Sequence, residues 1–89
     1  MTRGVSWNKV SFDTFAELGM LTDDERAVLE TRIKGWTRTK QSRELNMSMA
    51  TLDRTIARIK RKYDEVQPHA SDVLPVRRIS AEEIYMDNN

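Results

Sequence analysis

Cysteine is absent from this 89-residue chain, and histidine occurs once. Without cysteine there is no disulfide and no thiolate metal site, and a single histidine, His69, cannot form a ligand cluster alone. These absences exclude structural zinc and cysteine chemistry, so we expect no metal and no cofactor. Chains of this length bury a smaller share of their surface than larger domains do. The fold must therefore depend on one small core.

A long apolar run is also missing. Residues 1–10 contain Arg3, Asn8 and Lys9 and no apolar stretch, which is unlike a signal peptide or a membrane span. We therefore expect a cytoplasmic protein with no membrane partner.

Two acidic pairs, Asp23-Asp24 and Glu82-Glu83, have the composition of an acid–base or metal site. Each pair lies at an expected helix start, where carboxylates stabilise the positive end of the helix dipole. Because this explanation is sufficient for both pairs, we expect a protein that is not an enzyme.

Charges of both signs are present, but they are unevenly distributed along a chain whose formal net charge is +1. Residues 32–62 include ten basic and two acidic residues, a net charge balance of +8, whereas the rest of the chain has a net charge balance of −7. Such a basic segment favours phosphate contacts and speeds association with a polyanion. The alternative is a solvated helix face. The basic residues are Arg32, Lys34, Arg38, Lys40, Arg43, Arg54, Arg58, Lys60, Arg61 and Lys62.

Two helices are predicted in the first part of the chain. Residues 11–20 carry apolar side chains at the spacing of a short helix that Gly19 ends. Thr22 and Glu25 have the spacing of a capping box and predict a second helix over residues 23–34. Its apolar stripe consists of Val28, Leu29 and Ile33.

A third, short helix is predicted over residues 38–45. Gly35 follows the preceding helix as a left-handed C-cap, and Thr37 is the N-cap of the new one. Trp36, directly before this N-cap, is expected to pack inward as a hydrophobic staple.

The last predicted helix is the basic one. Asn46 tolerates the positive φ of a tight turn, Met47 closes the corner, and Ser48 is the N-cap. Pro68 ends this helix. Its apolar stripe has the spacing of four, three and four residues and consists of Leu52, Ile56, Ile59 and Tyr63.

The pattern beyond Pro68 is less regular. Residues 73–76 are predicted to be extended, because proline restricts its predecessor, and residues 80–83 form a capping box that starts one turn through residue 86. We therefore predict an all-α protein built around a three-helix helix-turn-helix core. Its parts are an N-terminal extension with a short helix (1–20), the helix-turn-helix domain (21–66) and a C-terminal tail (67–89).

Three helices, of which the last two are joined by a short turn and the last is basic, meet the requirements of a helix-turn-helix. An α-helix fits the major groove and presents its N-terminal half to base edges, while the preceding helix crosses the phosphate backbone. The positive end of that preceding helix, at Thr37, Arg38 and Thr39, can hold a phosphate. We expect the helix after Ser48 to enter the major groove.

Residues 21–63 also resemble a known family, the helix-turn-helix of LuxR-type regulators and of region four of sigma factors. The family usually has an apolar residue followed by alanine where this chain has Gln41-Ser42, and a turn glycine where it has Asn46. The resemblance implies a DNA-binding transcriptional regulator or a sigma-like factor. The spacing of the matching residues requires no gap. These residues are Leu21-Thr22, Glu25-Arg26, Val28-Leu29, Gly35-Trp36-Thr37, Leu45, Met47-Ser48, Thr51-Leu52 and Ile59.

The resemblance implies two groups of DNA-contacting residues. Arg54 can donate to guanine O6 and N7, and we take it as the main specificity residue. Asp53 either accepts from cytosine N4 or pairs with a neighbour, Arg54 or Arg58. The base-facing group, which inward packing of the apolar stripe also leaves outside, is Met49, Ala50, Asp53, Arg54 and Ala57. The group nearer phosphates is Thr37, Arg38, Thr39, Thr51, Arg58 and Arg61.

Double-stranded DNA is the partner that these patterns favour. The alternative is a protein-interaction adaptor, for example one that binds RNA polymerase, with no specific DNA readout. One recognition helix covers few base pairs, so a homodimer formed through the N-terminal helix or residues 79–86 is a further hypothesis. Trp36 and Tyr63 are expected in the core, where aromatics at helix junctions more often lie.

Overall fold

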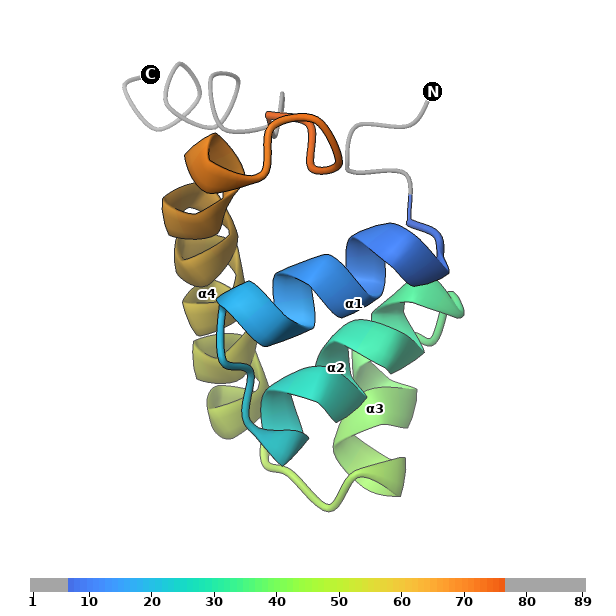
Figure 1. The fold of residues 1–89 in the computed structure, drawn as a ribbon. Coiled ribbons are helices and arrows are strands. Elements are labelled where there is room, and N and C mark those ends of the chain that lie inside the picture. Colours follow the sequence, from blue (N-terminus) through green and yellow to red (C-terminus); the bar gives the residue numbers. More distant parts are fainter. Residues whose placement is uncertain (1–6, 77–89) are drawn as a thin grey trace, which may run out of the picture.

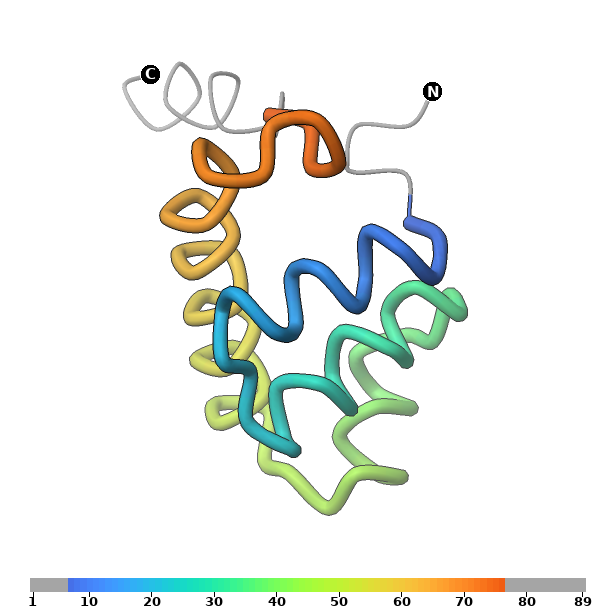
Figure 2. Tube along the Cα trace, viewed as in Figure 1, coloured from blue at the N-terminus to red at the C-terminus, as the bar shows by residue number. Residues whose placement is uncertain are grey.

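The computed structural model describes residues 7–76, and this part of the chain contains helices and no strand. The fold is all-α, as predicted. Figure 1 shows α4 along one side of the molecule, with α1, α2 and α3 on its other side. Figure 2 traces the chain through the same arrangement, with the turn from α3 to α4 at the bottom of the view. The elements are α1 (Lys9–Leu18), α2 (Asp23–Ile33), α3 (Arg38–Glu44), α4 (Met49–Val66) and the short 3-10 helix η1 (Gln67–His69).

Helix α1 begins before the predicted residue 11, because Asn8 caps it. The Asn8 side chain accepts from the Ser11 amide and the Ser11 hydroxyl accepts from the Asn8 amide, each at 2.9 Å. Asparagine is among the strongest N-caps, but here it lies ahead of the apolar spacing from which the helix was predicted. Gly19 ends α1, as predicted.

The starts of the other α-helices follow their predicted caps. Thr22, Thr37 and Ser48 each accept a hydrogen bond from the backbone amide three residues later. The two predicted left-handed turn residues also have positive φ, +89° at Gly35 and +55° at Asn46. Local side-chain and backbone chemistry therefore determines where α2, α3 and α4 begin.

The core lies along the inner stripe of α4, which we define as Leu52, Ile56, Ile59 and Tyr63. Three of its members are buried as predicted, and Ile56 is partly buried against them. The other apolar members of this core come from α1, the loop before α2, α2, the end of α4 and the segment after η1. They are Phe15, Ala16, Leu21, Val28, Leu29, Val66, Ala70 and Leu74.

Tyr63 joins α4 to segments at both ends of the described chain. Its ring packs edge-on against Phe15 at 5.3 Å and Trp7 at 5.8 Å between ring centroids. Its hydroxyl donates to the carbonyl oxygen of Pro75. Residues from the predicted N-terminal extension and tail thus share one core with residues 21–66.

The prediction of an extended segment at residues 73–76 is wrong for its first half. The amides of Val73 and Leu74 both donate to the Ala70 carbonyl, at 3.0 and 2.8 Å, and close a turn. Gln67 Nε2 donates to the Leu74 carbonyl at 2.9 Å. The turn prevails because it buries Leu74 completely against the core. The predicted helical turn at residues 80–86 lies outside the described residues.

Two apolar residues at the α2–α3 junction are not in the core, contrary to prediction. Ile33 is 40 % exposed, and Trp36 is only half-buried and does not join the core cluster. The ammonium of Lys40 lies 4.4 Å from the centroid of the Trp36 ring, which is a cation–π contact at the surface. The indole therefore packs within its own junction and does not act as a staple into the core.

A buried polar network lies at this junction, where an apolar contact was expected. Gln41 is fully buried, and its amide nitrogen donates to Val28 O at 3.0 Å and Thr31 Oγ1 at 2.8 Å. Its amide oxygen accepts from Arg32 Nη1 at 3.3 Å. Because the amide has partners on both sides, a polar residue is tolerated at a position that is usually apolar.

We expect Leu74→Ala to destabilise the protein by about 2–5 kcal/mol, because it leaves a cavity in the core. The matched control is Val76→Ala, in the same segment but 69 % exposed, with an expected change below about 0.5 kcal/mol. Urea unfolding followed by circular dichroism measures both. Equal stability of the two variants would show that the turn at residues 70–74 is not part of the folded core.

Candidate nucleic-acid interface

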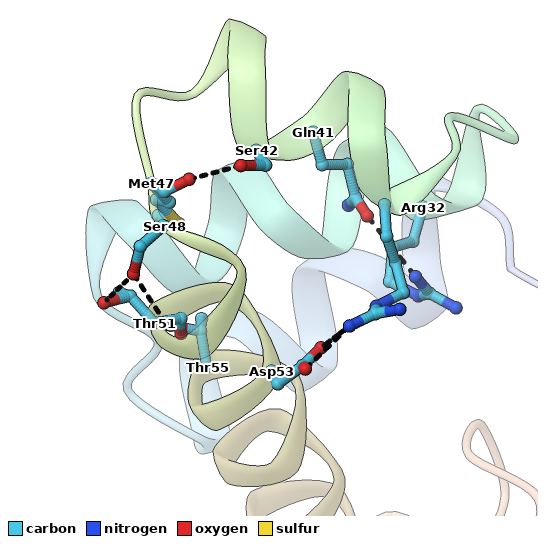
Figure 3. Close-up of polar contacts among 9 residues, drawn as sticks. Arg32, Gln41, Ser42, Met47, Ser48, Thr51, Asp53 and Thr55 are labelled. Atoms are coloured by element: carbon cyan, nitrogen blue, oxygen red, sulfur yellow. Dashed lines mark hydrogen bonds and ion pairs between the residues drawn. The ribbon is translucent and has the colours of Figure 1, made fainter.

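The turn between α3 and α4 sets the direction in which α4 leaves α3. The Ser42 hydroxyl donates to the Met47 carbonyl (Figure 3), and the Met47 amide donates to the Ser42 carbonyl at 3.0 Å. Leu45 and Met47 pack partly buried against the core. Asn46 between them takes the left-handed conformation that reverses the chain. The turn is closed on itself by hydrogen bonds and attached to the core on both sides.

Opposite its buried residues, α4 presents a second stripe, which we name the outer stripe. With about 100° of rotation per residue, positions spaced four, three and four apart align on one face. All members of the outer stripe are exposed, two of them small and two cationic. They are Ala50, Arg54, Ala57 and Arg61.

The five residues predicted to face bases are all exposed on α4. Ala50, Arg54 and Ala57 belong to the outer stripe, and the Arg54 Nη2 group donates to Thr51 Oγ1 at 3.2 Å. Met49, 40 % exposed, and Asp53 flank this stripe on the side of α3.

Asp53 pairs with a partner that the sequence did not indicate. Both of its carboxylate oxygens accept from Arg38 of α3, with Nη2 at 2.6 and 2.7 Å and Nε at 3.0 Å. The predicted alternatives, Arg54 and Arg58, are not its partners. About half of each side chain in the pair is exposed. The contact therefore lies at the surface where α3 meets α4.

The residues predicted nearer phosphates differ in how open they are. Thr51 is half-buried, and the others are exposed. Two hydroxyls already have partners, since Thr37 Oγ1 accepts from the Lys40 amide at 3.1 Å and Thr51 Oγ1 accepts from Ser48 at 3.0 Å. The exposed members are Thr37, Arg38, Thr39, Arg58 and Arg61.

A buried ion cluster around Glu25 was not predicted. The Glu25 carboxylate, 1 % exposed, accepts from Lys62 Nζ at 2.7 Å and from Arg58 Nε at 2.9 Å. It also accepts from the Thr22 amide at 3.0 Å, which completes the predicted capping box. Arg58 and Lys62 lie four residues apart on α4 and so share a face. No local pattern links that face to α2, because the contact spans more than thirty residues.

The cluster strongly perturbs the acidity of this carboxyl group. Burial by itself raises the pKa of Glu25, but hydrogen bonds from Lys62, the Thr22 amide and Arg58 outweigh it and lower the pKa from 4.5 to about 2. The ionised carboxylate therefore stabilises the α2–α4 contact throughout the neutral range.

In the part of the chain that the structure describes, no group of three or more histidine, cysteine or carboxylate side chains is placed to hold a metal ion. No helix there is long and apolar enough to cross a membrane. Comparison of the chain with family models, curated proteins and solved structures gives no match.

We expect Glu25→Gln to flatten the dependence of stability on pH. Because the folded pKa lies below the unfolded one, the ionised carboxylate contributes fully above about pH 4.5, and the contribution is lost as the pH falls toward 2. It should amount to about 2 kcal/mol, since the partly exposed Arg58 weakens the pairing. Glutamine can still complete the capping box.

Urea unfolding at several pH values between 7 and 2.5 measures this difference. The control is Glu30→Gln, which removes an exposed carboxylate from the same helix and should keep the pH dependence of the wild type. If Glu25→Gln and wild-type proteins lose stability in parallel on acidification, the cluster is not the source of that dependence.

Proposed function

We propose that the protein binds double-stranded DNA, with the outer stripe of α4 in the major groove and the turn before it setting the angle of entry. The observation that carries this proposal is the composition of the outer stripe, two arginines and two alanines on an exposed helix face. We further propose that it acts as a transcriptional regulator or a sigma-like factor, in line with the resemblance of residues 21–63 to those families.

The outer stripe suits a groove better than a flat partner. The major groove admits an α-helix, and alanines at positions 50 and 57 let the backbone approach the bases closely. Their methyl groups can contact the thymine methyl, while Arg54 can donate two hydrogen bonds to guanine. Arg61, two turns beyond Arg54, lies where the helix would pass the phosphates.

Exposed cations on α2, on its C-cap and on α3 support the same proposal. In a helix-turn-helix the helix before the recognition helix crosses the phosphate backbone, so exposed cations there could contact phosphates. Phosphate contacts of this kind supply affinity and orientation and carry no sequence information. These residues are Arg32, Lys34, Arg38, Lys40 and Arg43.

Binding to a random-sequence duplex should be measurable and steeply dependent on salt. Each neutralised phosphate contributes a slope of about −0.9 to the plot of log K against log salt, and we expect about four such contacts. Fluorescence anisotropy with a labelled duplex measures the slope. No binding at low salt would overturn the proposal and favour the adaptor, for example one that binds RNA polymerase.

Arg54→Ala should weaken binding to preferred sequences by about 1–3 kcal/mol and leave binding to random duplex nearly unchanged. Selection of bound sites from a random DNA pool, followed by titration of the selected sites, measures both. The control is Arg43→Ala, an exposed α3 arginine that should lose affinity uniformly. A uniform loss for Arg54→Ala would make it a phosphate contact, and a palindromic selected site would support a homodimer.

A further inference from the structure

The Arg38–Asp53 pair has a geometry that restricts what Asp53 can do. One guanidinium donates through Nε and Nη2 to both carboxylate oxygens, over distances of 2.6 to 3.0 Å. This is the fork-like arrangement in which an arginine recognises a carboxylate most strongly. The contacts leave the Nη1 amino group of Arg38, with its two N–H donors, outside the pair.

The position of the pair relative to the outer stripe matters as much as its geometry. Asp53 precedes Arg54 in the chain and lies on the α3 side of the stripe, while Arg38 is the first residue of α3. An unpaired carboxylate on this face would repel DNA phosphates. Three of the roughly four lone-pair sites of its carboxylate already accept from Arg38, so at most one is left for a cytosine. Holding Arg38 is therefore the role that its contacts favour.

An arginine side chain loses considerable rotamer freedom when it is fixed on a ligand. A carboxylate that already restrains the guanidinium in the free protein reduces that loss on binding. Restraint by Asp53 therefore raises affinity where this saving exceeds the repulsion between its carboxylate and the DNA phosphates.

We propose that Asp53 is a positioning residue, which holds Arg38 at the edge of the outer stripe so that Nη1 donates to a DNA phosphate, and that Asp53 does not read a base. This inference rests on the proposed DNA-binding function and adds a residue that acts through another. If Asp53 does not contact a base, Met49 is the one predicted base-facing residue that remains on the α3 side of the outer stripe.

Asp53→Asn and Glu44→Gln provide a matched comparison. Both substitutions remove one acid from the basic segment, but Glu44 makes only a long 3.4 Å contact with its neighbour Arg43. Affinity for random duplex should rise slightly for Glu44→Gln and fall about three- to ten-fold for Asp53→Asn. The salt slope of Asp53→Asn should become shallower by about 0.9, one phosphate contact, as it should for Arg38→Ala.

Arg38→Ala combined with Asp53→Asn should bind no more weakly than Arg38→Ala alone, because the two residues act as one unit. Thermal unfolding of every variant checks that the fold is intact. If Asp53→Asn binds as tightly as wild type or more tightly, the inference is overturned. A loss confined to sites with one particular cytosine would also overturn it and make Asp53 a base reader. Failure of the wild type to bind any duplex would instead overturn the proposed function itself.

Discussion

Burial of the inner stripe of α4 is the constraint on which the other elements depend. Helices α1, α2, α3 and η1 all contact α4, and residues of α1, α2 and the segment after η1 share one apolar core with the stripe. A helix that turns Leu52, Ile59 and Tyr63 inward must turn Ala50, Arg54 and Ala57 outward. The packing requirement and the composition of the exposed face are therefore two consequences of the same periodicity.

Polar contacts fix the orientations that apolar packing leaves free. Apolar burial is not directional, whereas the Glu25 carboxylate accepts from three fixed donors on the loop before α2 and on α4. The buried Gln41 amide fixes α3 against α2 in the same way. The first turns of α2 and α3 are thereby held against the rest of the fold, which a stripe of leucines alone would not specify.

The parts of the fold that the sequence predicted correctly are those with local causes. The caps at Thr22, Thr37 and Ser48 and the left-handed residues Gly35 and Asn46 act within a few residues of themselves, and each is as predicted. The prediction did not find the partners of distant residues, such as Arg38 with Asp53 and Glu25 with Lys62.

Trp36 and Ile33 differ from prediction for a related reason. Helical spacing says which side chains share a face, but burial of that face depends on what packs against it, and at the α2–α3 junction that neighbour is the polar Gln41. Contacts between distant residues also change how much of the basic segment's charge is available at the surface. Arg58 and Lys62 of the basic segment donate to the buried carboxylate of Glu25, which lies outside that segment. The segment therefore presents less positive charge at the surface than its balance of +8 suggests. Beyond Lys62 come Asp64 and Glu65. The exposed cations of α4 all precede this acidic pair, and Arg54 alone lies in the N-terminal half that an inserted helix would present to base edges.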